Sequence, residues 1–155
     1  DEAAMEEDEV EIAVQINGKT RAVISIPKDI AKEEALAKGK EALGDKAGLV
    51  RYGSCLLPMD ETLALCAVDL GGRPYFVYDA SFAGQSCGGM DVQMAREFFY
   101  AVSYSAMMNL HLKVLYGEND HHKLEAMYKA FAKALSAAAR HDDRIVGVLS
   151  TKGSI

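Results

Sequence analysis

Residues 109–130 read NLHLKVLYGENDHHKLEAMYKA and predict a strand, a turn and a helix in succession. Leu110, Leu112 and Val114 are spaced two apart, which is typical of a strand that buries one face against a core. His111 falls on the opposite face of that strand. Gly117 then breaks the pattern and indicates a turn.

The helix expected after this turn begins near Asn119 or Asp120, because both residue types cap helix N-termini well. It is expected to run to about Arg140. Its apolar stripe repeats every three or four residues, as in a helix that packs one face on a core. The members of this stripe are Leu124, Met127, Tyr128, Phe131 and Leu135.

His121, His122 and Glu125 fall on the first turns of this helix. Neutral imidazoles and a carboxylate are good ligands for a divalent transition metal. Glu125 lies four residues after His121 and three after His122, so either histidine can share a helix face with it. Adjacent side chains point about 100° apart, so the two rings cannot easily hold one ion together. The pair predicts two metal ions, or one ion and a substrate contact.

Alternating apolar residues and turn signals outline the rest of the fold. The expected strands are 10–16, 21–26, 49–57, 62–70, 74–82 and 110–116. The expected helices are 31–43 and 91–109, the second capped by Asp91 and placing Met94, Phe98 and Val102 in the core. Residues 145–155 are expected to form a short extended tail. Strand hairpins followed by helices predict an α+β fold, with an antiparallel sheet and the helices packed on one face.

The bulk properties exclude some classes of protein. The 155 residues carry a net charge of -6, which argues against a nucleic-acid binder that relies on a basic face. Three cysteines without a paired spacing indicate reduced thiols and a cytoplasmic protein, with Cys66 in the core. The acidic start Asp1–Glu9 does not have the pattern of a signal peptide, and no membrane association is expected.

Several longer motifs, in order along residues 44–155, resemble the C-terminal part of the imidazoleglycerol-phosphate dehydratase family of histidine biosynthesis. They are RYGS (51–54), PMDETLAL (58–65), DLGGRPY (69–75), the stretch 109–130 quoted above and STKG (150–153). The resemblance implies a dehydratase half-domain with the ribosomal S5 domain 2-like fold. The family is built from two such halves, and only the second set of His-His-x-x-Glu ligands is found here.

Residues 10–43 carry a different resemblance. Their Val-Gln-Ile-Asn-Gly-Lys hairpin, followed by a proline and a helix rich in lysine and glutamate, resembles the C-terminal domain of leucyl-tRNA synthetase. The expected organisation is therefore a disordered acidic lead at 1–9, a synthetase-like hairpin and helix at 10–43, and a dehydratase-like domain at 44–155. We expect a fusion of two fragments.

The dehydratase resemblance implies a metal-dependent hydro-lyase that removes water from imidazole glycerol phosphate to give imidazole acetol phosphate. It implies manganese, with two ions per site. The metal ligands it implies are His111, His121, His122 and Glu125. The catalytic residues it implies are Glu125, His122 and Lys129, although Lys129 has the simple alternative of a surface lysine.

The same resemblance implies four residues for the substrate phosphate: Arg51, Arg73, Ser150 and Lys152. A guanidinium can bind two phosphate oxygens at once, and a lysine adds a compact positive charge. The alternatives from the residues alone are that Arg73 belongs to a turn after two glycines and that Ser-Thr-Lys-Gly is a frayed tail.

Three functions compete at this stage. The first is the dehydratase, impaired because the ligand set is short, acting on a small phosphorylated imidazole in a homo-oligomer with sites at subunit interfaces. The second is an inactive fused or truncated folding and assembly module with residual metal binding. The third is a tRNA-associated synthetase appendage, which the net acidity disfavours.

Overall fold

The computed structural model describes residues 9–16, 19–27, 44 and 46–150. Strands β1 (Glu9–Ile16) and β2 (Lys19–Pro27) pair antiparallel, which confirms the two strands predicted at 10–16 and 21–26. The lead was predicted at 1–9, but Glu9 belongs to β1. Residues 1–8, the Asn17-Gly18 turn and the helix predicted at 31–43 lie outside the described residues. Of residues 10–43, the structure therefore describes only the two strands of this hairpin.

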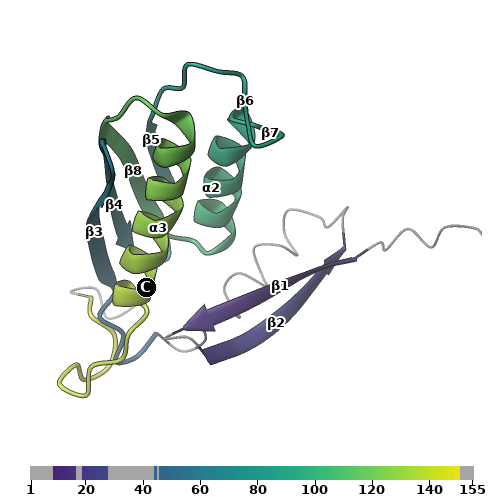
Figure 1. Cartoon of the computed structure of the whole chain (residues 1–155). Coiled ribbons are helices and arrows are strands. Elements are labelled where there is room, and N and C mark those ends of the chain that lie inside the picture. Colours follow the sequence, from purple (N-terminus) through teal and green to yellow (C-terminus); the bar gives the residue numbers. More distant parts are fainter. Residues whose placement is uncertain (1–8, 17–18, 28–43, 45, 151–155) are drawn as a thin grey trace, which may run out of the picture.

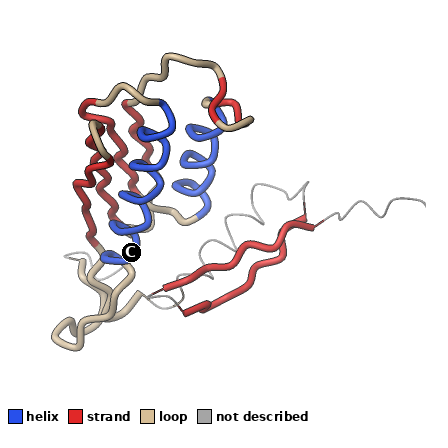
Figure 2. The backbone as a smooth tube through the Cα atoms, in the orientation of Figure 1, coloured by secondary structure: helices blue, strands red, loops and turns tan. Residues whose placement is uncertain are grey.

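A four-stranded sheet and two helices form the body of the dehydratase-like region (Figures 1 and 2). The strands are β3 (Tyr52–Met59), β4 (Thr62–Asp69), β5 (Tyr75–Asp79) and β8 (Asn109–Tyr116), in the spatial order β3-β4-β8-β5. The helices are α2 (Gln93–Ser105) and α3 (Asp120–Ala138), and both cover the same face of the sheet. A small hairpin of β6 (Ser86–Cys87) and β7 (Met90–Asp91) precedes α2.

The α+β fold with helices on one face is as predicted, but the sheet is mixed rather than antiparallel. Strand β5 pairs parallel with β8, whereas the β3–β4 and β4–β8 pairs are antiparallel. The physical reason is the connection through α2, because a helical crossover returns the chain to the end at which β5 began. Gly71 and Gly72 therefore do not close a hairpin, and β8 lies between β4 and β5.

Several predicted boundaries differ from the structure. Strand β3 begins at Tyr52 rather than residue 49, directly after Arg51, whose φ of 71° turns the backbone. Helix α2 ends at Ser105 rather than residue 109, because Met107 adopts a φ of 51° and turns the chain into β8. In the described part of the tail, residues 145–150 form no strand.

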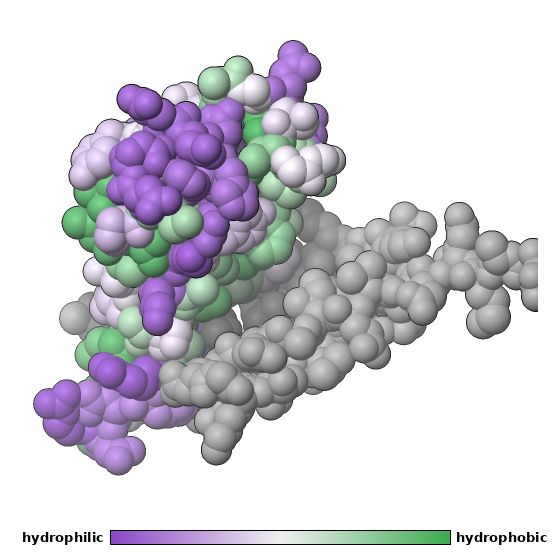
Figure 3. Space-filling view, in the orientation of Figure 1, coloured by the Kyte–Doolittle hydropathy of each residue, from purple (hydrophilic) through white to green (hydrophobic). Residues whose placement is uncertain are grey.

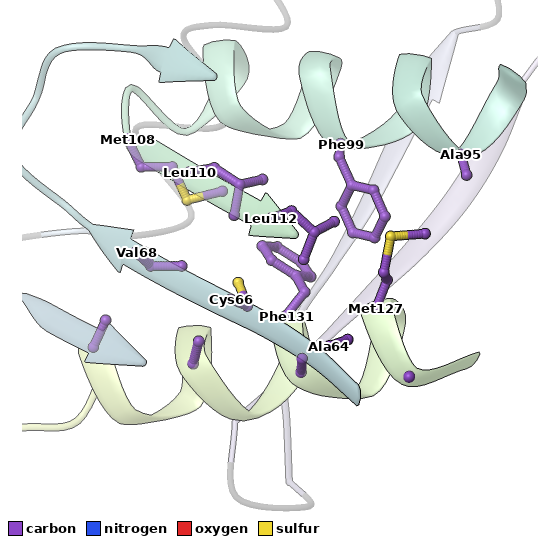
Figure 4. Packing of buried hydrophobic residues seen from close by; sticks show 14 of the residues in the cluster. Ala64, Cys66, Val68, Ala95, Phe99, Met108, Leu110, Leu112, Met127 and Phe131 are labelled. Atoms are coloured by element: carbon purple, nitrogen blue, oxygen red, sulfur yellow. The ribbon is translucent and has the colours of Figure 1, made fainter. Parts of the chain in front are cut away.

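The core lies between the sheet and the two helices (Figure 4). Every second residue of β4 is buried, and Cys66 is one of them, as predicted. Leu110 and Leu112 of β8 point into the same layer, which confirms the predicted strand face. From the helices, Met127 and Phe131 of α3 meet Phe99 of α2 there, with the rings of Phe99 and Phe131 5.4 Å apart between centroids. None of the described helices is long and apolar enough to cross a bilayer.

Helix α2 turns a different face to the core than predicted. Met94 and Phe98, expected inside, are 55% and 44% exposed, and the buried residues are Ala95, Phe99 and Ser103. Phe98 and Phe99 are both apolar, so the sequence allows either of two adjacent faces of α2 to pack on the core. The sheet accepts the one with the small residues Ala95 and Ser103, and Ser103 donates its hydroxyl to the Met108 and Tyr75 carbonyls.

Candidate functional site

The candidate site begins at the N-terminus of α3, where Asn119 is the capping residue. Its side-chain Oδ1 accepts from the backbone N–H groups of His121 (2.9 Å) and His122 (3.3 Å). These N–H groups have no partner within the helix, so the asparagine satisfies them and fixes where the helix starts. The cap therefore sets the position of both histidines, and of the two capping residues that the sequence left open, the structure uses Asn119.

His121, Glu125 and Lys129 form a line along one face of α3. The Nε2 atom of His121 lies 3.2 Å from Oε2 of Glu125, and Nζ of Lys129 lies 2.5 Å from the other carboxylate oxygen. The hydrogen bond from Lys129 is the main cause that lowers the pKa of the Glu125 carboxyl. Glu125 is therefore an ionised carboxylate, able to act as a ligand or to accept a proton.

His122 points in another direction, toward the turn between β3 and β4. Its Nδ1 lies 2.7 Å from Oε2 of Glu61, and its Nε2 lies 3.5 Å from Oδ2 of Asp60. The hydrogen bond to Glu61 is the main cause that raises the pKa of His122. The pKa of Glu61 is lowered far below its usual range, first by the Asn119 N–H and then by His122.

Sequence reasoning missed Asp60 and Glu61. Both were visible within the PMDETLAL motif, but 61 residues separate Glu61 from His122. No local periodicity connects a hairpin turn with a helix start at that distance. The usable signal was a pair of carboxylates in a tight turn between two strands, next in space to the strand that leads into α3.

The two imidazoles do not converge on one point. Their ring centroids are 6.1 Å apart and their planes are inclined by 58°, in agreement with the argument from helix geometry. Among the described residues, no three histidine, cysteine, aspartate or glutamate side chains are grouped so that they could hold a metal ion. The imidazole and carboxylate donors suit manganese in kind. They lie in two pairs, His121 with Glu125 and His122 with Asp60, and each pair alone is short of a full set of metal ligands.

His111 lies away from these two pairs. It is exposed on the face of β8 opposite the helices, beside Ala67 of β4 and Val77 of β5 in the register of the sheet. Its ring centroid is 6.4 Å from that of Tyr75. The sequence placed His111 on this strand face, but the structure does not bring it together with His121 and His122.

Arg51, a candidate for the phosphate, is held in a network of its own. Its Nε and Nη2 atoms bind the two carboxylate oxygens of Asp69 at 2.7 and 3.1 Å, and Nη1 donates to the Leu149 carbonyl at 2.6 Å. The hydrogen bond to Asp69 is the main cause that raises the pKa of Arg51. The side chain is only 11% exposed, so its first role is to tie the tail at Leu149 to the sheet.

Two further phosphate candidates, Ser150 and Arg73, lie around the same end of the sheet. Ser150 follows Leu149 directly, so the Arg51 network places it nearby. Arg73 is exposed just before β5, and its carbonyl accepts from the Asn109 side chain at 2.7 Å. Lys152 lies outside the described residues.

The sheet separates the candidates into two groups. Tyr52, Asp69, Asn109 and Tyr75 form one row across the four strands, and Arg51 and Arg73 flank this row. The histidines of α3 follow the far end of β8, an eight-residue strand that spans roughly 25 Å at about 3.3 Å per residue. Figure 3 shows hydrophilic surface over the N-terminal part of α3. The described residues of one chain thus do not place the phosphate candidates beside the metal candidates.

Comparison with known proteins connects this arrangement to a family. The model of the family described as imidazoleglycerol-phosphate dehydratase matches residues 34–135. This match begins at residue 34, inside the stretch 10–43 for which the sequence predicted a synthetase resemblance, and so it extends the dehydratase match to residues before 44. The dehydratase of Lachnoclostridium phytofermentans is 60% identical over 116 residues, which cover 75% of this chain and 59% of that protein. The dehydratase of Acetivibrio thermocellus is 53% identical over 116 residues, with 60% of its length covered.

Solved structures agree in fold as well as in sequence. The dehydratase from Staphylococcus aureus aligns with a TM-score of 0.66 and 38% identity, covering 72% of this chain and 67% of that one. The enzyme from Pyrococcus furiosus aligns with a TM-score of 0.66 and 28% identity, covering 86% of this chain and 76% of that one. The chain spans about 60% of the length of the curated relatives it matches. It belongs to the imidazoleglycerol-phosphate dehydratase family.

Proposed function

We propose that this chain carries one part of a manganese-dependent imidazoleglycerol-phosphate dehydratase, which removes water from imidazole glycerol phosphate to give imidazole acetol phosphate. The proposal rests on the start of α3 in this chain, where His121 lies beside Glu125 and His122 lies beside Asp60. A surface helix gains little from such an arrangement, since exposed pairs of this kind contribute little to stability. The arrangement fits a pair of metal half-sites better.

In this proposal, His121 and Glu125 supply donors to one ion and His122 to another. When bound, manganese would act as a Lewis acid that stabilises negative charge on the substrate imidazole as its C–H proton leaves. Glu125 is ionised and can accept a proton. Lys129 holds one of the carboxylate oxygens and would keep Glu125 in place while the other oxygen faces His121.

Arg51, Arg73, Ser150 and Lys152 are proposed to bind the phosphate. The guanidinium of Arg51 donates hydrogen bonds to Asp69 and to the Leu149 carbonyl oxygen. In this proposal Arg51 therefore acts mainly by fixing the tail that carries Ser150. Arg73 is exposed on the other side of the same row of the sheet. It offers the guanidinium more accessible to a phosphate.

The separation of the two groups supports a homo-oligomer with sites at subunit interfaces. One substrate molecule cannot reach both ends of a strand that spans roughly 25 Å. In an oligomer, the histidines of α3 from one copy and the phosphate-binding residues from another copy could contact the same substrate molecule. His111, exposed on the open sheet face, is proposed to join such a shared site from a neighbouring copy. We further propose a cytoplasmic location and a synthetase-like origin for residues 10–43.

A second candidate is an inactive assembly module with residual metal binding. The observation that favours it is the count of donors, since no three of them converge in the described part of the chain. The two candidates share the metal half-sites and differ in turnover.

Turnover with manganese distinguishes them. We expect the chain of 155 residues to form imidazole acetol phosphate far more slowly than the full-length relatives, because each half-site lacks donors. Product formation would be followed with the chain alone and with a full-length relative as the positive control. A rate equal to that of the relative would contradict the proposal of an impaired enzyme. A complete absence of product together with bound manganese would favour the assembly module.

A further inference from the structure

Glu61 lies in the two-residue turn between β3 and β4, and its two carboxylate oxygens have different partners. Oε1 accepts from the backbone N–H groups of Glu118 (3.1 Å) and Asn119 (2.8 Å) and from the Thr62 hydroxyl (3.1 Å). Oε2 faces Nδ1 of His122 at 2.7 Å. Three donors therefore fix the carboxylate while its second oxygen is directed at the imidazole.

The turn itself is held firmly. Met59 and Thr62 pair directly across it, and Asp60 adopts a left-handed φ of 48° that lets two residues close the hairpin. Thr62 is buried at its base. The position of Glu61 is thus set by the hairpin on one side and by the entry into α3 on the other.

An ionised carboxylate can only accept hydrogen bonds. At 2.7 Å, Nδ1 of His122 must therefore carry the proton, and in a neutral ring Nε2 then keeps its lone pair. The Oδ2 atom of Asp60 lies 3.5 Å from Nε2, which is too far for a good hydrogen bond. The lone pair of Nε2 is left available for a ligand.

We propose that Glu61 is a positioning residue for His122, which fixes the ring and its tautomer so that Nε2 is presented to a divalent metal ion. Carboxylates that hold metal-binding histidines in this way raise ligand basicity and select the coordinating nitrogen. This inference rests on the proposed function, because it assigns Nε2 of His122 to metal binding. The simpler alternative is that Glu61 only ties the hairpin turn to the start of α3.

The substitution Glu61→Gln separates the two roles. The amide oxygen of the glutamine can still accept from Glu118, Asn119 and Thr62, so the structural ties remain. The amide nitrogen then faces Nδ1 as a donor, which requires Nδ1 to accept and moves the ring proton to Nε2. Glu118→Gln is the matched control, because it removes the same charge from an exposed neighbour that does not touch His122.

The tautomer of His122 would be read by ¹⁵N–¹H NMR on the metal-free full chain, in buffer alkaline enough to keep the ring neutral. Manganese affinity would be measured on the same variants from the free-ion signal in electron paramagnetic resonance. We expect an Nδ1–H ring in the parent chain and in Glu118→Gln, and an Nε2–H ring in Glu61→Gln. We expect manganese affinity to fall roughly 10- to 100-fold in Glu61→Gln alone, with the melting temperature nearly unchanged.

The two readouts separate failure of the inference from failure of the proposed function. An Nε2–H ring in the parent chain, or an unchanged tautomer in Glu61→Gln, would overturn the role of Glu61. Unchanged manganese affinity after the tautomer has moved would overturn it as well. A parent chain with the Nδ1–H ring but no manganese binding would instead contradict the metal site, while the control of the ring by Glu61 would stand.

Discussion

Gly53 shows how one residue can set the distance between two layers of this fold. It is the glycine of the RYGS motif and lies in β3 directly under α3. A Cβ atom at this position would overlap the Ala134 carbonyl oxygen and would lie 2.8 Å from the Ala138 nitrogen. Both atoms belong to the helix backbone, which cannot turn aside as a flexible side chain can. The glycine therefore allows β3 to approach α3 closely.

Replacing Gly53 by alanine should destabilise the protein strongly. We expect a loss of about 3 kcal/mol or more in the free energy of unfolding, because the added methyl group must push a helix away from the sheet. Urea denaturation would measure this. Gly84→Ala is the control, since a Cβ there meets only ordinary contacts, the nearest at 3.5 Å from the Ser86 carbonyl oxygen. Equal stability of Gly53→Ala and Gly84→Ala would contradict the close approach of β3 and α3.

At the scale of elements, the first turn of α3 is tied to the loop that follows β5. Asp120 accepts from the backbone N–H groups of Ala83 and Gly84 at 2.8 to 3.1 Å. Lys123 is only 7% exposed, and its Nζ lies 3.1 Å from both Asp120 Oδ1 and the Ser81 carbonyl oxygen. These contacts hold the loop against the helix start that carries His121 and His122.

Asp120→Asn should weaken this tie in a pH-dependent way. The Gly84 N–H is the main cause that lowers the pKa of Asp120, so its stabilising contribution is present above the ordinary carboxyl range, near pH 4, and is lost as the pH falls. We expect a cost of roughly 1–2 kcal/mol at neutral pH, shrinking in acid. Denaturant unfolding across this pH range would measure it.

Asp79→Asn provides the comparison for this experiment. Asp79 pairs with Lys113 on the exposed sheet face, where an ion pair contributes well under about 1 kcal/mol. A difference between Asp120→Asn and the parent chain that stayed constant from neutral to acidic pH would show that the charge of Asp120 is not what holds the loop.

The elements that the sequence predicted well are those with local signals. Leu110 and Leu112 marked β8 by alternation, and the pair Asn119-Asp120 marked the start of α3 as possible capping residues, of which Asn119 is the cap. The failures were non-local. The parallel pairing of β5 with β8 depends on the path of the chain through α2. The choice of Phe99 over Phe98 for the buried face of α2 depends on how the helix packs against the sheet.

At the scale of the whole molecule, the candidate site is divided between the two ends of the sheet. The sequence and its family resemblance named His121, His122, Glu125 and the arginines, but could not place them relative to one another. The sequence did not indicate Glu61 as a site residue, because its contact with His122 forms only when β3, β4 and β8 lie side by side. We propose that a second copy of the chain brings the two groups of residues together.

We propose that the start of α3 holds a divalent metal ion, and manganese binding by the full chain tests this most directly. His121→Ala should weaken binding at least about tenfold and leave the far-ultraviolet circular dichroism unchanged, since the exposed ring contributes little to the core. His141→Ala, at an exposed histidine beyond the end of α3, should bind manganese as the parent chain does. Equal manganese binding by His121→Ala and the parent chain would show that His121 does not bind the metal ion.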